Sequence, residues 1–224
     1  MKLTDLAMLR LHVEAVWGVK LPLIEQNEIT LLPESAQPDW QLYAADLEGG
    51  RVLIWRADLA SEEREKLLAR LDEIERLPER APLPPNASRE VALRLDAAPA
   101  LEMASARRLA RLLTEDDYAL IEDSWPGGTK KILLYQPIGV IVEGRLLSMA
   151  HSSRRTAEAC ELGIETLPGA RRQGYALAAT VVWSAAISAE GLTPIYSALA
   201  ENSASLRLAR AAGYREFARA VTLV

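Results

Sequence analysis

The sequence has little cysteine and lacks long apolar runs. Cys160 is its one cysteine, so no internal disulfide and no C-x-x-C metal site can form. A reducing cytoplasm is the compartment that fits this cysteine usage. No apolar run reaches the roughly 18 to 20 residues that a membrane helix needs. The first residues open an amphipathic stretch and not a signal peptide. We therefore expect a cytoplasmic protein with no membrane partner and no bound metal.

Positive charge is also scarce. The 224 residues include 26 Lys and Arg against 31 Asp and Glu, which gives a formal net charge of −5. Binding along a nucleic-acid backbone needs a basic surface, so no nucleic-acid partner is expected. Half of the residues are apolar, which is enough for a folded core in one large domain or two small ones.

The N-terminal part of the chain gives a helix–hairpin–helix pattern. The spacing of apolar residues and a Gly-Gly turn predict a helix, a hairpin and a second, strongly charged helix over residues 3–17, 40–57 and 61–76. Ser61 is the predicted N-cap of the second helix. Three prolines then fall within residues 82–85 and can continue neither a helix nor a central strand. We place a domain boundary there, between an N-terminal region, residues 1–85, and a second domain, residues 86–224.

The second domain alternates strands with helices, the pattern of an α/β protein. In chain order the sequence predicts a strand at 91–95, a helix in two pieces over 100–121, a hairpin over 138–150, a strand at 161–167, a buried helix at 175–189, a strand at 195–199, a helix at 202–212 and a strand at 217–224.

The most informative segment passes from a strand through a short turn into a helix, over residues 161–176. Such a turn leaves backbone N–H groups unpaired at the positive end of the helix dipole, where phosphate binds readily. Gly174 permits the unusual dihedral angles, and Arg171 and Arg172 add charged donors. The turn lacks the dinucleotide fingerprint and the Lys-Ser/Thr ending of a P-loop. An arginine-rich surface turn before a core helix is the alternative interpretation.

A second segment, Asn202…Leu208…Gly213-Tyr214, follows at a distinctive distance. Together the two segments resemble the GNAT superfamily of acyl-CoA-dependent N-acetyltransferases. Arg171-x-x-Gly174-x-Ala176 is similar to that family's Gln/Arg-x-x-Gly-x-Gly/Ala loop. The resemblance covers about residues 137–224 and is absent before the proline-rich stretch.

The resemblance implies a GNAT-like fold with a mixed sheet that parts between the strands at 161–167 and 195–199, preceded by an additional N-terminal α/β region. It also implies acetyl-CoA as cosubstrate. Its expected contacts are Ile164, Glu165 and Thr166 for the pantetheine, Arg171, Arg172, Gln173, Gly174, Tyr175 and Ala176 for the pyrophosphate, and Asn202 and Ser205 for the pantetheine or acyl end. Asn202 is equally suited to capping its helix.

The reaction needs a general base, and the candidates are Glu161, Glu165 and His151. The two glutamates alternate along one strand and share a face, which is also what an ordinary polar strand face would show. His151 ends the neighbouring strand and is equally compatible with a surface position. The tyrosine acid usual in the family is replaced by Ala209. Tyr196 or Tyr175 would have to substitute for it, unless the thiolate leaves unaided.

Three functions remain open from the sequence. The first is an N-acetyltransferase that moves an acetyl group to a primary amine of a small molecule or peptide by direct attack in a ternary complex. The second is a catalytically inactive CoA-binding sensor or scaffold, and the third is an α/β protein that binds another phosphate ligand. Residues 1–85 fit a degenerate copy of the same fold, favoured by the likeness of the two hairpins, or a cover over the substrate cleft. A homodimer is compatible with the sequence.

Overall fold

The structure is a computed structural model that describes residues 3–78, 81–125 and 135–224. The chain divides into two compact units. Unit 1 takes in residues 1–94, 197–206 and 216–224, and unit 2 takes in residues 95–196 and 207–215. The units do not coincide with a division at residue 86, because segments from the C-terminal part of the chain pack with the N-terminal elements.

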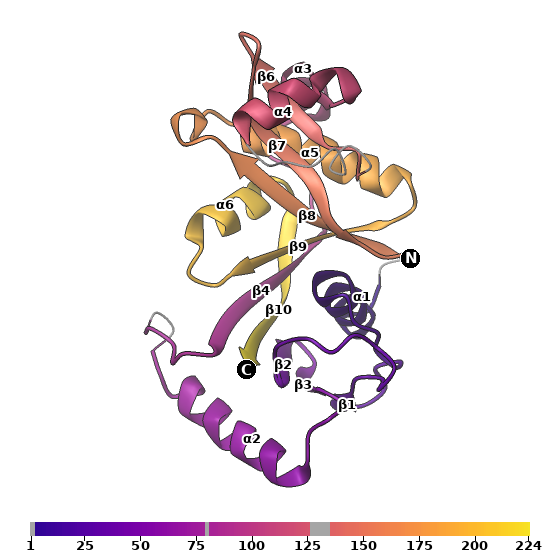
Figure 1. The fold of residues 1–224 in the computed structure, drawn as a ribbon, viewed down its shortest axis with the longest axis vertical. Helices are drawn as coiled ribbons and strands as arrows, with labels where there is room; N and C mark the ends of the chain where they lie inside the picture. The colour runs from indigo at the N-terminus through magenta and orange to yellow at the C-terminus, as the bar shows by residue number, and fades with distance from the viewer. Residues whose placement is uncertain (1–2, 79–80, 126–134) are drawn as a thin grey trace. The chain divides into compact units, whose positions relative to one another are not determined.

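Unit 1 is built on a mixed sheet (Figure 1). Its elements are α1 (Asp5–Trp17), β1 (Glu28–Thr30), β2 (Leu42–Leu47), β3 (Gly50–Trp55), α2 (Ser61–Glu75), β4 (Ala87–Leu95) and the ends of β9 (Thr193–Leu199) and β10 (Tyr214–Leu223). The strands are hydrogen-bonded in the order β1-β3-β2-β10-β4-β9. Strand β1 runs parallel to β3, whereas β2 is antiparallel to both β3 and β10.

The two helices of unit 1 cover opposite faces of this sheet. Leu9 and Val13 of α1 pack in one cluster with Tyr43 and Ile54. The residues that alternate with these in the strands, Leu42 and Trp55, pack against Leu67, Leu71 and Ile74 of α2. Because successive side chains of a strand point to opposite faces, this arrangement buries both sides of β2 and β3.

Unit 2 is also built on a mixed sheet. Its elements are α3 (Met103–Leu109), β5 (Ala110–Leu112), η1 (Glu115–Asp117), α4 (Tyr118–Ser124), β6 (Ile138–Val142), β7 (Arg145–Arg155), β8 (Ala159–Thr166), η3 (Pro168–Ala170), α5 (Tyr175–Ala189), the starts of β9 and β10, and the end of α6 (Ser203–Ala211). The strand order is β9-β8-β7-β6-β5. Strand β8 is parallel to β9, and the other pairs are antiparallel.

Helices of unit 2 define the two faces of its sheet. On one face, Trp183 of α5 is fully buried and its indole Nε1 donates to Ser152 Oγ of β7 at 3.3 Å. On the other face, Met149 of β7 packs with Ile121 of α4. Side-chain alternation therefore places His151, between Met149 and Ser153 in β7, on the face away from α5.

The expected α/β class with a mixed sheet is confirmed. The buried helix over residues 175–189 has the predicted bounds. The helix expected in two pieces over 100–121 forms as α3 and α4, but a strand, β5, lies between them, because Ala110–Leu112 pair with β6 and tertiary pairing overrides helical spacing. The N-cap of α2 is Ala60 and not Ser61, since the N–H of Ala60 donates to Glu63 Oε2 at 2.8 Å.

Two features are absent from the described residues. None of the helices in these ranges is long and apolar enough to cross a membrane. Likewise, within residues 3–78, 81–125 and 135–224, no group of three or more His, Cys, Asp or Glu side chains is placed to hold a metal ion.

Candidate functional site

The turn between β8 and α5 has a backbone that favours binding of an anion. Arg172 and Gly174 both adopt left-handed conformations, with φ of 62° and 83°. Gly174 is the N-cap of α5, and such a φ suits glycine because a side chain would be strained there. Left-handed residues in a turn point successive N–H groups into one concavity, the geometry known to hold phosphate oxygens.

The N–H groups of this turn are free to donate. Before the turn, Arg171 N donates to Pro168 O at 3.4 Å, and within α5 the first helical bond runs from Ala178 N to Gly174 O at 3.0 Å. Between them, the amides of residues 172–177 donate to no acceptor within the described part of the chain. These donors lie at the start of a 15-residue helix, so its dipole also favours negative charge there.

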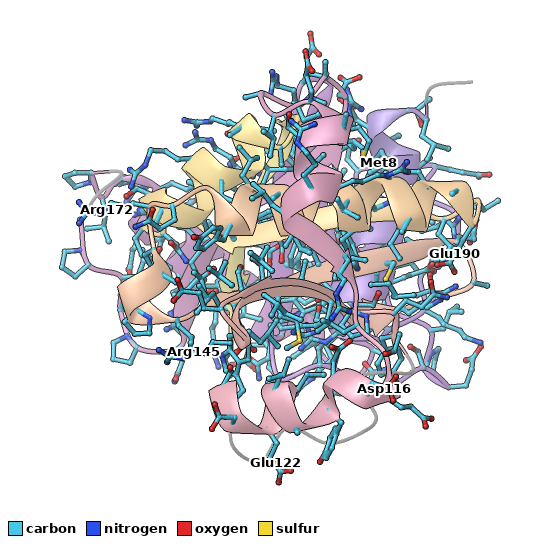
Figure 2. All side chains as sticks on the ribbon, turned by 90° about the horizontal axis from the view of Figure 1, so that it is seen from above. Met8, Asp116, Glu122, Arg145, Arg172 and Glu190 are labelled. Carbon is cyan, nitrogen blue, oxygen red and sulfur yellow. The ribbon has the colours of Figure 1, made fainter. Side chains whose placement is uncertain are left out.

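The side chains around the turn leave it accessible. Arg171, Arg172 and Gln173 are exposed, while Tyr175 and Ala176 are half-buried. Neither arginine side chain forms a hydrogen bond or ion pair with another described residue. Figure 2 shows Arg172 at one end of α5 and Glu190, the partner of Arg155, at the other. The positive side chains therefore lie at the same helix end as the free amides.

Strand β8 leads into this turn with one edge open. It pairs with β9 only through Ala159, Cys160 and Glu161, and the register ends at Glu161↔Ile195. On its other side β8 stays paired with β7 as far as Thr166. Within the described residues, the backbone of Ile164–Thr166 therefore has a strand partner on one side alone.

His151 lies directly over Gly163, its cross-strand partner in β8. A Cβ atom at Gly163 would be 2.4 Å from His151 Cε1, so only glycine leaves room for the ring. The imidazole Nε2 is 3.9 Å from Glu165 Oε1. That distance is too long for a direct hydrogen bond. Half-buried His151 and exposed Glu165 form the titratable pair of this strand face.

Glu161 and Tyr196 occupy different surroundings. Glu161 is buried, and its Oε2 accepts from Arg154 Nη1 at 3.0 Å and from Ser153 Oγ at 2.8 Å. A bulge in β7 after Ser152 brings these two residues to the carboxylate. Tyr196 is 2% exposed and packs edge-on against Tyr214, with ring centroids 5.3 Å apart.

Comparison with known proteins shows which family the chain is similar to around this site. Residues 137–220 match the family model described as GNAT acetyltransferase. This part of the chain is therefore similar to GNAT acetyltransferases. It includes β6 to α6 and most of β10, and so contains the anion-binding turn, the open edge of β8 and the His151–Glu165 pair.

Solved GNAT structures share the fold. A GNAT-family acetyltransferase from Colwellia psychrerythraea is 17% identical with a TM-score of 0.50, and the match covers 61% of this chain and 55% of that one. The chain thus spans about half the length of that protein. A GNAT-family protein from Novosphingobium aromaticivorans is 24% identical with a TM-score of 0.48, covering 64% of this chain and 69% of that one. No curated protein matches the chain.

The last motif of the matched segment forms the start of a helix. Asn202 Oδ1 accepts from Ser205 N at 3.1 Å, so Asn202 caps α6. Both residues belong to unit 1, whereas the turn at 172–176 belongs to unit 2. Ala209, where the family has its tyrosine, is fully buried. No acidic side chain is supplied from that position.

Sequence reasoning missed the role of Gly163. The residue is a glycine within a strand, which often marks a close approach of another group. Cys160 is 0% exposed, and burial raises the pKa of its thiol.

Proposed function

We propose that the protein transfers an acetyl group from acetyl-CoA to a primary amine of a small molecule or peptide, by direct attack in a ternary complex. The observation that carries the proposal is the run of unpaired amides over residues 172–177 at the start of α5, inside the segment that matches the GNAT family model. A doubly charged pyrophosphate is the part of acetyl-CoA that such donors would bind.

The residues around the turn fit the rest of the cosubstrate. Exposed Arg171 and Arg172 would add charge-assisted hydrogen bonds to the phosphates. The open edge of β8 at Ile164–Thr166 offers backbone groups to the amides of the pantetheine arm, as an added strand would. Asn202 and Ser205 remain proposed contacts of the pantetheine or acyl end.

His151 is the proposed general base. The amine nitrogen attacks the thioester carbonyl, a C–N bond forms, the C–S bond breaks and the thiolate leaves with CoA. The proton lost by the amine passes to the imidazole of His151, directly or through one water, and Glu165 at 3.9 Å stabilises the imidazolium. Glu161 suits this role less, because Arg154 and Ser153 already engage its carboxylate. Tyr196 as general acid would need its buried ring to become accessible.

Thiol release tests the proposal. The full-length protein is mixed with acetyl-CoA and a panel of primary amines, and free CoA is followed with Ellman's reagent. The blank should be low, because Cys160 is the one protein thiol and is fully buried. We expect Glu165→Gln to lower the rate, and the same exchange at exposed Glu143, in the β6–β7 turn, to leave it unchanged. No release above the blank with any amine would refute the proposal.

A second function is favoured by one observation. Because Ala209 is buried and supplies no acid, the protein is also suited to bind CoA without turning it over, as a sensor or scaffold. This alternative predicts saturable CoA binding by calorimetry with no thiol release for any amine, whereas the enzyme shows both.

A further inference from the structure

The hairpin of β7 and β8 has one more residue on the β7 side than on the β8 side. Away from the turn His151 pairs with Gly163, and nearer the turn Arg154 pairs with Glu161. Two residues of β7 but one residue of β8 lie between these pairs, and Ser153 is the extra residue. Such a β-bulge re-aims the side chains next to it, and bulges are common beside functional sites.

The bulge determines which face of the sheet His151 occupies. If the pairing at the turn of the hairpin continued without a bulge, Ser152 would lie opposite Gly163 and His151 opposite Ile164. A slip of one residue moves every side chain of a strand to the other face of the sheet. The imidazole would then leave the face of Glu165 and lie on the face that α5 covers. The extra residue in β7 is therefore what allows His151 to lie over Gly163.

Glu161 binds the bulge through its side chain. Its Oε2 accepts from Ser153 Oγ at 2.8 Å and from Arg154 Nη1 at 3.0 Å. Ser153 Oγ also lies 3.3 Å from the backbone oxygen of Glu161. The side chain of Glu161 is 8% exposed, whereas Ser153 and Arg154 are exposed. Removing the donors of a buried carboxylate costs more free energy than the hydrogen bonds contribute, so the carboxylate favours the bulged register, in which both donors reach it.

We propose that Glu161 is a positioning residue, which holds the bulge in β7 and thereby keeps His151 over Gly163. The inference rests on the proposed function, in which His151 accepts the proton that the amine loses. Glu161 then contributes to the reaction through His151 and does not contact the substrate. Ser153 and Arg154 are the donors through which it holds the bulge.

Two variants distinguish a positioning residue from a general base. Glu161→Gln keeps a side-chain oxygen that can accept from Ser153 and Arg154, but the amide takes up no proton, and we expect kcat to stay within about threefold of the wild type. Ser153→Ala combined with Arg154→Met keeps the carboxylate and removes both donors. This double variant should lower kcat by about tenfold or more, since a shift of about 1 Å in a catalytic group can cost up to about 100-fold. If Glu161 were itself the base, the order of the two variants would be reversed.

Three measurements on the full-length protein follow the effect. Initial rates of thiol release give kcat, calorimetry gives the affinity for CoA, and NMR reports the rings of His12 and His151, the two histidines of the chain, which His151→Asn assigns. The His151 resonances should move in the double variant and stay near their wild-type positions in Glu161→Gln. The affinity for CoA should be unchanged in both, because the bulge lies at the opposite end of β8 from the turn at residues 172–177. A merely structural role would lower the number of CoA sites per chain and leave the resonances in place.

Two further variants complete the test. Glu161→Leu fills the buried site with an apolar side chain, which proteins often tolerate, and should lower kcat as the double variant does, so the test stays valid if the double variant folds poorly. Arg155→Gln is the matched control, because Arg155 is the next residue of β7 and pairs with Glu190 outside the bulge, and it should react as the wild type does.

Two results would overturn the proposal. One is a larger loss of kcat in Glu161→Gln than in the double variant. The other is wild-type kcat with unmoved His151 resonances in both the double variant and Glu161→Leu. If no amine releases thiol from the wild-type protein, the proposed function fails, and the resonances by themselves decide whether Glu161 holds His151 in place.

Discussion

Replacing Gly163 by alanine should displace the imidazole of His151, the proposed base, without changing its chemical identity. The new Cβ would lie 2.4 Å from His151 Cε1, 2.6 Å from Nε2 and 3.0 Å from Nδ1. Carbon contacts rest near 3.5 Å, so the ring must retreat by about 1 Å. The backbone of Gly163 does not have a positive φ, so alanine is tolerated there conformationally. The imidazole is 17% exposed and has solvent to move into.

This displacement predicts a large kinetic effect and a small effect on stability. A shift of about 1 Å in a catalytic group can cost up to about 100-fold, so we expect kcat/KM of Gly163→Ala to fall by about 10- to 100-fold. The free energy of unfolding should fall by about 1–2 kcal/mol at most, as for mild overpacking. Initial rates of thiol release and urea denaturation measure the two quantities. Gly49→Ala is the matched control, since nothing lies within 4 Å of its Cβ.

A double-mutant cycle decides whether the effect passes through His151. If Gly163→Ala acts by moving the imidazole, combining it with His151→Asn should slow the reaction no more than His151→Asn alone. The acid limb of the pH–rate profile should be altered in Gly163→Ala and absent in His151→Asn. Additive losses in the double variant, or wild-type kcat/KM in Gly163→Ala, would refute the assignment of His151 as a base seated on Gly163.

Three other predictions concern stability and reactivity. Asp117 accepts from both terminal nitrogens of Arg111 at 2.7 and 2.8 Å, which lowers its pKa to about 2. Because the folded pKa lies below the unfolded value, this stabilisation is present above about pH 4 and is lost as the pH falls towards 2. Asp117→Asn should thus lower the free energy of unfolding by about 1–2 kcal/mol at neutral pH, a value discounted because Arg111 is half exposed. In urea denaturation, the difference between the variant and the wild type should vanish in acid. Gly213→Ala should cost about 2–4 kcal/mol, since its φ is +96° and the new Cβ would meet Ala97 O at 2.3 Å; equal denaturation midpoints would contradict this. Cys160, whose pKa is raised chiefly by burial, should react with Ellman's reagent only as fast as the protein opens, and immediate labelling of native protein would show the burial to be wrong.

Features with local causes could be predicted from the sequence. The helix at 175–189 begins after a left-handed Gly174, because a glycine at that position both permits the turn and starts the helix. The hairpin of β2 and β3 follows from two apolar runs around Gly49-Gly50, and β2–β3 pairing confirms it. In each case the residues that determine the structure are neighbours in the chain.

Features that depend on distant pairing could not be predicted. The two helical pieces expected over 100–121 leave no strand between them, yet Ala110 pairs with Val140 in β6. Likewise, Asp46 and Arg219 are far apart in sequence, yet they are direct cross-strand partners in β2 and β10. The alternation of apolar and polar residues predicts which face of the sheet a side chain occupies. It does not predict which residue of the neighbouring strand lies opposite, because that register is set by packing of the whole sheet.

Gly163 is a residue from which the position of His151 could have been predicted. A glycine inside a strand loses entropy on folding and supplies no side chain, so it is favoured where a bulky group approaches. The hairpin arrangement of β7 and β8 places His151 among the few residues that could lie opposite. The sequence alone would thus favour His151 over Glu161 as the base, because a glutamate on the same strand as Gly163 does not need a glycine beside it. A glycine within a strand can therefore indicate a functional residue as a charged side chain does, because the space left by its absent Cβ is where the ring of a neighbouring residue fits.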